Sequence, residues 1–302
     1  MTIDLTGRVA IITGAGGGLG REHALLLARR GAKVVVNDLG AAVDGTGGSS
    51  SAAEMVVAEI VEAGGEAMAN AASVTDFEQV QAMVADAVAR WGRIDIVVAN
   101  AGFLRDRSFA KMTIEDFKAV IDVHLMGAVH CAKAVWDLMR EQNYGRIVLT
   151  TSSSGLYGNF GQSNYSAGKM ALVGLMQTLS LEGARNNIKV NCLAPTAGTR
   201  MLEGIVPDAV MKAFTPKVVS PAVLALVGED APTRSILCAG AGSFEQAYVT
   251  LTRGIHIGGG DNAAEEIVRR WSEISDRSHE LLPDVGLDQS RLELANSGTM
   301  AI

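Results

Sequence analysis

The chain is poor in cysteine and aromatic residues, and it lacks long apolar runs. Of its 302 residues 5% are aromatic, and its three cysteines are far apart and form no CxxC pair: Cys131, Cys192 and Cys238. Isolated cysteines of this kind are typical of reduced, mostly buried thiols in an intracellular protein. No run of about 18 apolar residues occurs, so no membrane-spanning helix is predicted. The histidines have no partners at metal-ligand spacing, and no metal is expected.

Positive charge is also in short supply. The 26 Lys and Arg residues are outnumbered by 33 Asp and Glu residues, which gives a formal net charge of −7. An acidic chain is poorly suited to broad binding of nucleic acid or of an anionic membrane. The first residues resemble neither a signal peptide nor a transit peptide, and the last are not a peroxisomal address. We therefore expect a cytoplasmic protein.

Short apolar runs alternate with helical patterns along most of the chain. Strands are predicted at 9–13, 33–37, 66–71, 94–99, 146–151 and 188–193, and helices at 21–30, 52–63, 77–91, 114–139 and from about 165. This alternation predicts the α/β class, with a doubly wound parallel sheet (Rossmann-like) covered by helices on both faces. Ligands in such sheets bind at the carboxyl ends of the strands.

A glycine cluster lies where a dinucleotide would bind. Gly14, Gly18 and Gly20 follow the first predicted strand and open the first helix, so the backbone can approach a pyrophosphate closely. Asp38 ends the second strand, where a carboxylate can accept hydrogen bonds from the adenosine ribose and repel a 2′-phosphate. NAD is therefore favoured over NADP. Asn100, Ala101 and Gly102 end the fourth predicted strand, and we expect them beside the adenine part of the cofactor.

A second group of residues predicts the chemistry. Tyr165 and Lys169 are four residues apart, so on a helix they lie on one face. A phenol normally loses its proton near pH ~10, and a neighbouring ammonium would lower that pKa towards neutrality. Ser152, thirteen residues before Tyr165, can hydrogen-bond the oxygen whose charge changes in the reaction. Together with the glycine cluster, these residues predict hydride transfer between a carbonyl/alcohol pair and a nicotinamide.

In order and spacing these motifs resemble those of the short-chain dehydrogenase/reductase family. Within it the chain is similar to the dehydrogenase units of peroxisomal multifunctional enzymes, on the segments 36–40, 104–109, 157–162 and 194–201. The resemblance implies an NAD-dependent (3R)-3-hydroxyacyl-CoA dehydrogenase. Tyr165 would be the acid/base, Lys169 would hold the nicotinamide ribose, and Ser152 would orient the substrate oxygen. Other positions that the resemblance assigns to the cofactor are Leu19, Ser73, Val74, Thr196 and Thr199. It also implies a homodimer or homotetramer.

Some positions depart from the family pattern or allow two interpretations. His124 stands where the family usually has a catalytic asparagine, and Ser73 stands in a segment that usually carries an aspartate near the adenine. Asn159 either lines the substrate cleft or belongs to a structural turn. Arg105 and Arg107 either bind a CoA phosphate or are solvated surface charges.

The pattern weakens after about Gly242, which divides the chain into two parts. We expect a dinucleotide-binding and catalytic domain at 1–245 and a partly disordered C-terminal helical extension at 246–302. In the extension, 261–273 is expected to form a short helix, and the last twenty residues are expected to be poorly ordered. The Gly- and Ser-rich stretch 40–51 predicts a surface loop, and 201–214 a mobile lid over the substrate.

Three other functions stay open beside the leading one. A 17β-hydroxysteroid dehydrogenase would use the same chemistry on a sterol alcohol. A 3-oxoacyl-carrier-protein reductase is less favoured, because Asp38 disfavours NADPH. A nucleotide-sensing binding protein would have no need of Ser152, Tyr165 and Lys169 together. Under each enzymatic reading the partner is a small molecule, an acyl-CoA or a steroid.

Overall fold

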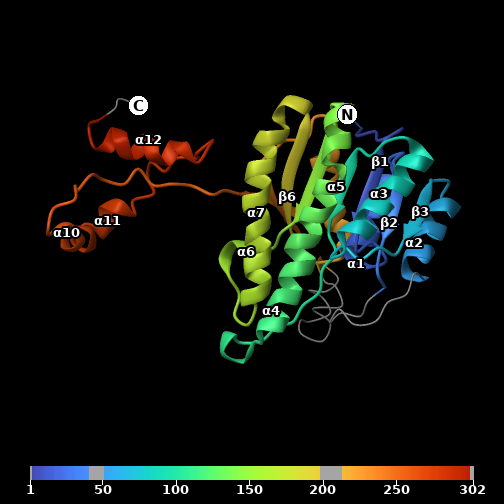
Figure 1. Cartoon of the computed structure of the whole chain (residues 1–302), viewed down its shortest axis with the longest axis horizontal. Coiled ribbons are helices and arrows are strands. Elements are labelled where there is room, and N and C mark those ends of the chain that lie inside the picture. The colour runs from blue at the N-terminus through green and yellow to red at the C-terminus, as the bar shows by residue number, and fades with distance from the viewer. Residues whose placement is uncertain (1, 41–50, 198–212, 300–302) are drawn as a thin grey trace. The chain divides into compact units, whose positions relative to one another are not determined.

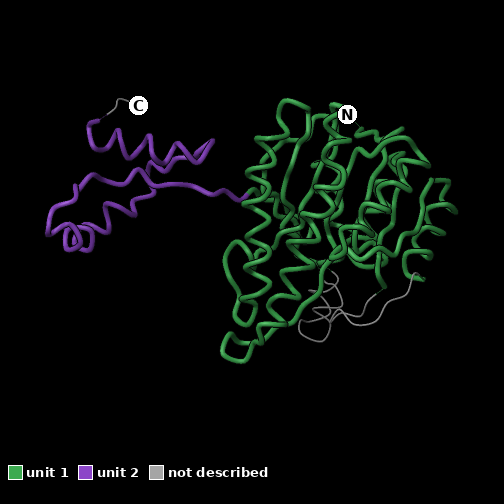
Figure 2. The backbone as a smooth tube through the Cα atoms, viewed as in Figure 1, with its two compact units in different colours: residues 1–246 green, residues 247–302 purple. Residues whose placement is uncertain are grey.

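A computed structural model describes residues 2–40, 51–197 and 213–299 (Figure 1). The chain consists of two compact units, Met1–Gln246 and Ala247–Ile302 (Figure 2). The sequence placed a boundary after residue 245, next to this division. Most of two predicted segments, the loop at 40–51 and the lid at 201–214, lies outside the described residues, as does Thr199.

Among the described residues, eight strands form one sheet in the order β3-β2-β1-β4-β5-β6-β7-β8. The strands are β1 Val9–Thr13, β2 Lys33–Asn37, β3 Ala67–Asn70, β4 Ile96–Ala99, β5 Gly145–Thr150, β6 Ile188–Thr196, β7 Ile236–Gly240 and β8 Ser243–Ala247. Every pairing from β3 through to β7 is parallel. Strands β1, β4 and β5 are buried along their whole length, as expected where helices cover both faces. The predicted doubly wound parallel sheet is confirmed.

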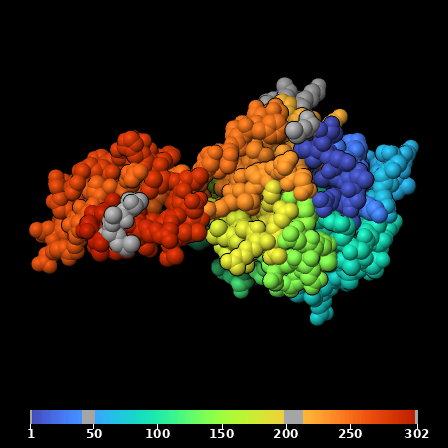
Figure 3. Space-filling model, turned by 90° about the horizontal axis from the view of Figure 1, so that it is seen from above, coloured from blue at the N-terminus to red at the C-terminus, as the bar shows by residue number. Residues whose placement is uncertain are grey.

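Two layers of helices enclose the sheet (Figure 1). One layer consists of α1 Gly18–Arg29, α2 Ser51–Glu62 and α9 Pro216–Val227. The other consists of α3 Phe77–Trp91, α4 Ile114–Ile121, α5 Gly127–Gln142 and α7 Ser163–Gly183. In the space-filling view α7 and α5, yellow and light green, lie next to each other on the surface (Figure 3). Among the described residues, four short helical segments connect these elements: η1 Phe109–Lys111, η2 Asp122–Met126, α6 Ser153–Tyr157 and η3 Ala184–Asn186.

The core under the first helix layer explains why these elements stay together. Ile12, Val36 and Val98 face it from neighbouring strands, and Leu27 and Val223 enter it from α1 and α9. Each of these side chains is completely buried or nearly so. Burying one such side chain stabilises the fold by about 1.5–3 kcal/mol, so the shared core holds the strand ends in place.

The helix that the sequence predicts at 114–139 is confirmed as one helical stretch with a local irregularity. A π-helical turn, η2, which the sequence did not predict, lies within it between α4 and α5. Within the described ranges, the whole stretch Ile114–Gln142 is the one helix long and apolar enough to cross a membrane by length and hydropathy. This stretch packs against the sheet, and 39% of its most apolar 18-residue segment is buried. A core helix of a globular protein meets the same criteria, so this stretch is weak evidence for a membrane span.

Unit 2 contains three helices among its described residues: α10 Ala263–Arg269, α11 Trp271–Ile274 and α12 Leu287–Asn296. The sequence predicted one helix at 261–273; the structure has two shorter ones there, α10 and α11, and α11 ends one residue beyond the predicted range. The expectation that the last twenty residues are poorly ordered is wrong for α12. There the Asp288 carboxylate accepts hydrogen bonds from the backbone N–H groups of Asp284 (2.8 Å) and Val285 (3.0 Å), and Leu292 is buried.

His23 on α1 gives the fold a measurable sensitivity to acid. Its side chain is fully buried, with Nδ1 2.8 Å from Oγ of Ser220 on α9, and burial lowers its pKa to about 3. An unfolded histidine titrates at about pH 6.5. Between that pH and about pH 3 the unfolded chain therefore binds a proton at His23 and the folded chain does not. The stability that neutral His23 allows is therefore lost as the pH falls from ~6.5 towards 3.

Replacing His23 by Gln should remove this dependence. Between pH 7 and pH 5 the variant should lose about 2 kcal/mol less of its unfolding free energy than the unmodified chain. Urea unfolding at the two pH values measures the difference. His279→Gln is the control, since His279 is exposed in unit 2 and should leave the pH dependence unchanged. Equal losses for His23→Gln and the unmodified chain would contradict the assignment.

Candidate functional site

The glycine loop between β1 and α1 has no room for side chains. A Cβ on Gly20 would lie 2.1 Å from the Gly14 carbonyl oxygen, and one on Gly14 would lie 2.8 Å from Cα of Ala101. Gly14 also has a φ of 64°, and Gly18, at the first position of α1, has a φ of 52°. Leu19 is half-buried and packs against the core. The loop therefore exposes backbone, and not side chains, at the N-terminus of α1, as an anion site requires.

Asn100 ties β4 to this loop. Its Nδ2 donates to the carbonyl oxygens of Thr13 (3.1 Å) and Gly14 (3.3 Å), and Thr13 Oγ1 accepts from the backbone N–H groups of Asn100 and Ala101 at 3.0 Å each. Gly102 is needed just beyond, because a Cβ there would lie 2.1 Å from Cε1 of His124. These residues thus fix the loop between two strand ends.

Asp38 is held beside the same loop. One carboxylate oxygen accepts from the backbone N–H of Gly16 and the other from that of Gly40, each at 2.7 Å. The carboxylate is therefore fixed at the carboxyl end of β2, next to the glycines, where the sequence placed it.

Ser73 and Val74 follow strand β3 at the same edge of the sheet. The Ser73 hydroxyl lies 2.8 Å from Oγ1 of Thr75, so it is engaged locally. Val74 is buried, and its carbonyl oxygen lies 2.8 Å from Nδ1 of His130 on α5. A narrow cleft extends from Val74 to the end of β1. Its lining residues include Thr13, Val74, Ala99, Ala101, Val123 and His124.

Ser152 and Tyr165 meet beyond the carboxyl end of β5. Ser152 is buried and caps α6, where its Oγ accepts a hydrogen bond from the Ser154 backbone N–H at 3.1 Å. Its side chain also hydrogen-bonds Tyr165, which lies in the first turns of α7. The neighbouring Thr151 hydroxyl is engaged elsewhere: its Oγ1 donates to the Lys169 carbonyl oxygen at 2.6 Å. Of the consecutive Thr and Ser residues at 150–154, Ser152 is the one whose hydroxyl the structure brings to Tyr165.

Lys169 is buried one turn after Tyr165, with its Nζ 5.5 Å from the centre of the Tyr165 ring. The ammonium group donates to the carbonyl oxygen of Thr150. Burial lowers the pKa of Lys169 to about 7. The expected lowering of the Tyr165 pKa is not found: burial raises it above the ordinary value, against the Ser152 hydrogen bond, which lowers it. Desolvation outweighs the nearby ammonium, whose hydrogen bond is made to the backbone.

His124 completes the surroundings of Tyr165. The two rings meet edge to face, with centroids 5.0 Å apart and planes at 87°. Nε2 of His124 lies 2.8 Å from the Phe103 carbonyl oxygen, whereas its Nδ1 is buried without a hydrogen-bond partner among the described residues. Burial, and secondarily the charge of Lys169, lowers the pKa of His124 to about 3, so the ring is neutral at pH 7. The π-helical turn η2 places this ring, and no sequence signal predicted that turn.

The remaining predicted residues lie at the edges of the site. Asn159 is exposed, and its Nδ2 donates to Oε1 of Gln162 at 3.0 Å. Thr196 is exposed at the end of β6. Arg105 forms an ion pair with Asp116 at 3.0 Å. No cluster of three or more potential metal ligands occurs in residues 2–40, 51–197 and 213–299.

Two residues near Tyr165 were not singled out from the sequence. Gln162, which is buried, donates a hydrogen bond from Nε2 to Oδ2 of Asp106 at 2.7 Å. Both lie inside segments that carry the family resemblance, 104–109 and 157–162, but their pairing across the fold is visible only in the structure.

Comparison with known proteins places these features in a family. The family model described as short chain dehydrogenase matches residues 8–208. Peroxisomal multifunctional enzyme type 2 of Drosophila melanogaster is 46% identical over 283 residues, covering 90% of this chain and 46% of that enzyme. Its full-length structure matches with a TM-score of 0.80 and 38% identity, covering 97% of this chain and 50% of the enzyme. The chain thus spans about half the length of that relative.

Two further relatives are shorter. A putative short-chain type dehydrogenase/reductase of Mycobacterium tuberculosis is 47% identical over 272 residues, covering 90% of this chain and 95% of that protein. The structure of a 7α-hydroxysteroid dehydrogenase complexed with NADH and 7-oxo glycochenodeoxycholic acid matches with a TM-score of 0.72 and 29% identity, covering 80% of this chain and 95% of that one.

Proposed function

Because this chain belongs to the short-chain dehydrogenase family and is an oxidoreductase acting on CH–OH groups, we propose that it interconverts a 3-hydroxyacyl-CoA and a 3-oxoacyl-CoA with NAD. The observation that carries the proposal is the meeting of Ser152, Tyr165 and Lys169 beyond the carboxyl end of β5. Similarity to the Drosophila enzyme over 90% of the chain supports the acyl-CoA substrate.

The described residues fit a dinucleotide. Glycine at positions 14 and 20 lets the loop pack tightly at the N-terminus of α1, where backbone N–H groups suit a pyrophosphate, and the fixed Asp38 carboxylate suits a ribose with two free hydroxyls. Lys169 would hold the nicotinamide ribose. When bound, NAD supplies a hydride acceptor for the substrate carbon.

The protein's own groups would then handle the proton. During oxidation Tyr165 accepts the proton of the substrate hydroxyl, and Ser152 holds the oxygen as it becomes a carbonyl. In the reverse direction Tyr165 returns the proton. Neutral His124 packs against the Tyr165 ring and adds no positive charge, so Lys169 is the cation nearest to the tyrosinate among the described contacts.

A panel of substrates tests the proposal. Purified protein with NAD should reduce the cofactor with a (3R)-3-hydroxyacyl-CoA and far more slowly with the (3S) isomer. Turnover of a 17β-hydroxysteroid alone would instead favour the second candidate, a hydroxysteroid dehydrogenase, which the match to the 7α-hydroxysteroid enzyme supports. Reduction of a carrier-linked 3-oxoacyl group with NADPH would favour a third candidate, the 3-oxoacyl-carrier-protein reductase. Cofactor binding without turnover of any substrate would indicate a binding protein.

The cytoplasmic location and the homodimer or homotetramer stay predictions.

Cofactor preference should depend on Asp38. In the Asp38→Asn variant the amide oxygen can still accept one of the two backbone hydrogen bonds, but the charge that repels a 2′-phosphate is lost. We expect the ratio of kcat/KM for NADP to that for NAD to rise at least about tenfold, or about 1.4 kcal/mol. Initial rates with both cofactors measure the ratio. An unaltered preference would show that another residue excludes NADP.

A further inference from the structure

The loop that follows β4 is held by two elements that flank Tyr165. The carbonyl oxygen of Phe103 lies 2.8 Å from Nε2 of His124, whose ring packs against the Tyr165 ring. Farther along the loop, the backbone N–H of Arg107 donates to the carbonyl oxygen of Gly161 at 2.8 Å, just before α7 begins. The loop is therefore bound to η2 on one side of Tyr165 and to the start of α7 on the other.

Asn164 makes the connection in the middle of this loop. Its side chain is completely buried, and both ends of its amide are hydrogen-bonded. Nδ2 donates to the Arg105 carbonyl oxygen at 3.1 Å, and Oδ1 accepts from the backbone N–H of Tyr165 at 2.7 Å. One buried side chain thus bridges the backbone of the loop and the backbone of Tyr165.

The acceptor half of this amide serves the start of α7. Tyr165 is the third residue of that helix, and the first backbone N–H groups of a helix have no partner within it. Gln162, at the N-cap position, makes no side-chain cap hydrogen bond. Asn164 Oδ1 satisfies the Tyr165 N–H instead. By itself this half would make Asn164 a structural residue.

The donor half relates Tyr165 to the cofactor side of the site. Four residues before Arg105, the backbone N–H of Ala101 donates to Thr13 Oγ1 at 3.0 Å, at the end of β1 and next to the glycine loop. The bond from Asn164 to Arg105 therefore limits how far Tyr165 can move from the strand ends that would hold the dinucleotide. Proton and hydride leave the same substrate, so the spacing of their acceptors affects the rate.

We propose that Asn164 is a positioning residue that holds Tyr165 at a fixed place relative to the loop after β4, and so relative to the bound cofactor. This inference rests on the proposed role of Tyr165 as the acid/base. Because Asn164 is completely buried, it acts through Tyr165 and not on the substrate itself. Loss of its donor should slow the chemical step and leave cofactor binding unchanged.

Two substitutions remove the donor in different ways. Asn164→Asp keeps the shape of the side chain and an acceptor for the Tyr165 N–H, at a helix start that favours negative charge, but it cannot donate to Arg105. Asn164→Ser is too short to reach the Arg105 carbonyl and adds no charge. In both variants kcat should fall about 10- to 100-fold, as for a small misplacement of a reacting group. The KM of the substrate and the Kd of NADH should stay within about threefold. A loss confined to Asn164→Asp would show that the new charge acts, and not the missing donor, and would contradict the proposal.

Asn191 on β6 provides matched control variants. It is completely buried, its Nδ2 donates to the Pro232 carbonyl oxygen at 2.8 Å, and its Oδ1 accepts from the Ser235 backbone N–H at 3.0 Å. Asn191→Asp and Asn191→Ser thus make the same changes in a bridge between β6 and the stretch before β7. At a temperature where circular dichroism shows every variant folded, the Asn191 variants should keep the kcat of the unmodified protein. An equal loss of kcat at both positions would reduce Asn164 to a structural residue.

Amide hydrogen exchange without substrate separates this inference from the proposed function. The Arg107 N–H, which is bonded to Gly161, reports opening of the loop. It should exchange about three- to tenfold faster in both Asn164 variants, because one hydrogen bond that closes the loop is lost. Faster exchange in a protein that turns over none of the tested substrates would mean that the proposed function fails while the link through Asn164 stands. Unchanged exchange, or faster exchange with an unchanged kcat, would overturn the positioning role.

Discussion

Replacing Tyr165 by phenylalanine should lower kcat about 1,000-fold, in the middle of the range for losing a general acid/base. Phenylalanine keeps the ring that packs edge to face against His124 with centroids 5.0 Å apart, so α7 should fold unchanged. It removes the hydroxyl that hydrogen-bonds Ser152 and that we propose exchanges the proton. Initial rates of NADH formation with the best substrate of the panel measure the loss.

Two controls make this result specific. NADH binding, followed by calorimetry, should stay within about threefold of the unmodified protein, because Gly14, Gly20 and Asp38 are untouched. Tyr157→Phe should keep its activity, since that side chain is 73% exposed on α6. A Tyr165→Phe enzyme that retains more than about a tenth of the turnover would show that another group carries the proton.

The sheet could be predicted from the sequence because its strands are locally distinct. Val9–Thr13 and Lys33–Asn37 are short apolar runs that end at glycine or aspartate, and both strands have these bounds in the structure. Tyr165 and Lys169 could be paired because their spacing matches one helical turn. Helix α9 was missed, since Pro221 within it argues against a helix in the sequence.

Features that depend on long-range packing could not be predicted in this way. Asp106 and Gln162 are 56 residues apart, and only the fold brings them together. The π-helical turn that places His124 has no local signature. The direction of the Tyr165 pKa depends on burial and on where the Lys169 ammonium makes its hydrogen bond, neither of which follows from residue spacing.

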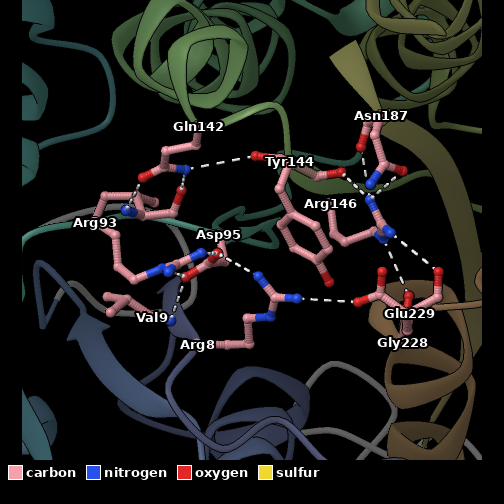
Figure 4. Close-up of polar contacts among 12 residues, drawn as sticks. Arg8, Val9, Arg93, Asp95, Gln142, Tyr144, Arg146, Asn187, Gly228 and Glu229 are labelled. Atoms are coloured by element: carbon pink, nitrogen blue, oxygen red, sulfur yellow. Dashed lines mark hydrogen bonds and ion pairs between the residues drawn. The ribbon is translucent and has the colours of Figure 1, made fainter. Parts of the chain in front are cut away.

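The opposite end of the sheet contains a polar cluster that should matter for stability and not for catalysis. Arg146, near the start of β5, is completely buried, and its guanidinium donates to several oxygens of the chain (Figure 4). Backbone carbonyl oxygens that accept from it are those of Gly228 (3.0 Å), Gly145 (2.8 Å), Asn187 (2.8 Å) and Glu229 (3.0 Å). The Tyr144 ring lies 4.1 Å from this guanidinium and 3.6 Å from that of Arg8. One side chain thus joins β5 to the end of α9 and to the turn before β6.

Arg146→Met should therefore lower the free energy of unfolding by about 2–4 kcal/mol, since it removes the guanidinium from the buried carbonyl groups of Gly145 and Gly228. The Asn187 and Glu229 carbonyl groups keep other donors, the Gly145 backbone N–H and the Lys189 ammonium. The loss is limited by the relief of burying a charge, a cost that also appears in the lowered pKa of Arg146. Arg146→Lys should lose less stability than Arg146→Met, because an ammonium keeps the charge and can still donate to some of these carbonyl groups. It should still be less stable than the unmodified protein, because it cannot reach all four carbonyl groups at once.

Urea unfolding at pH 7 measures both variants, with Arg185→Met, an exposed position in η3, as the control that should change stability by less than about 0.5 kcal/mol. Gly145 begins β5 whereas Ser152 follows its other end, so at a temperature where Arg146→Met stays folded its kcat should match that of the unmodified protein. A stability loss below about 1 kcal/mol would mean that water or a neighbouring donor satisfies those carbonyl groups as well as the guanidinium does. A loss of kcat at full folding would instead show that strand β5 transmits the change to the site of Ser152 and Tyr165.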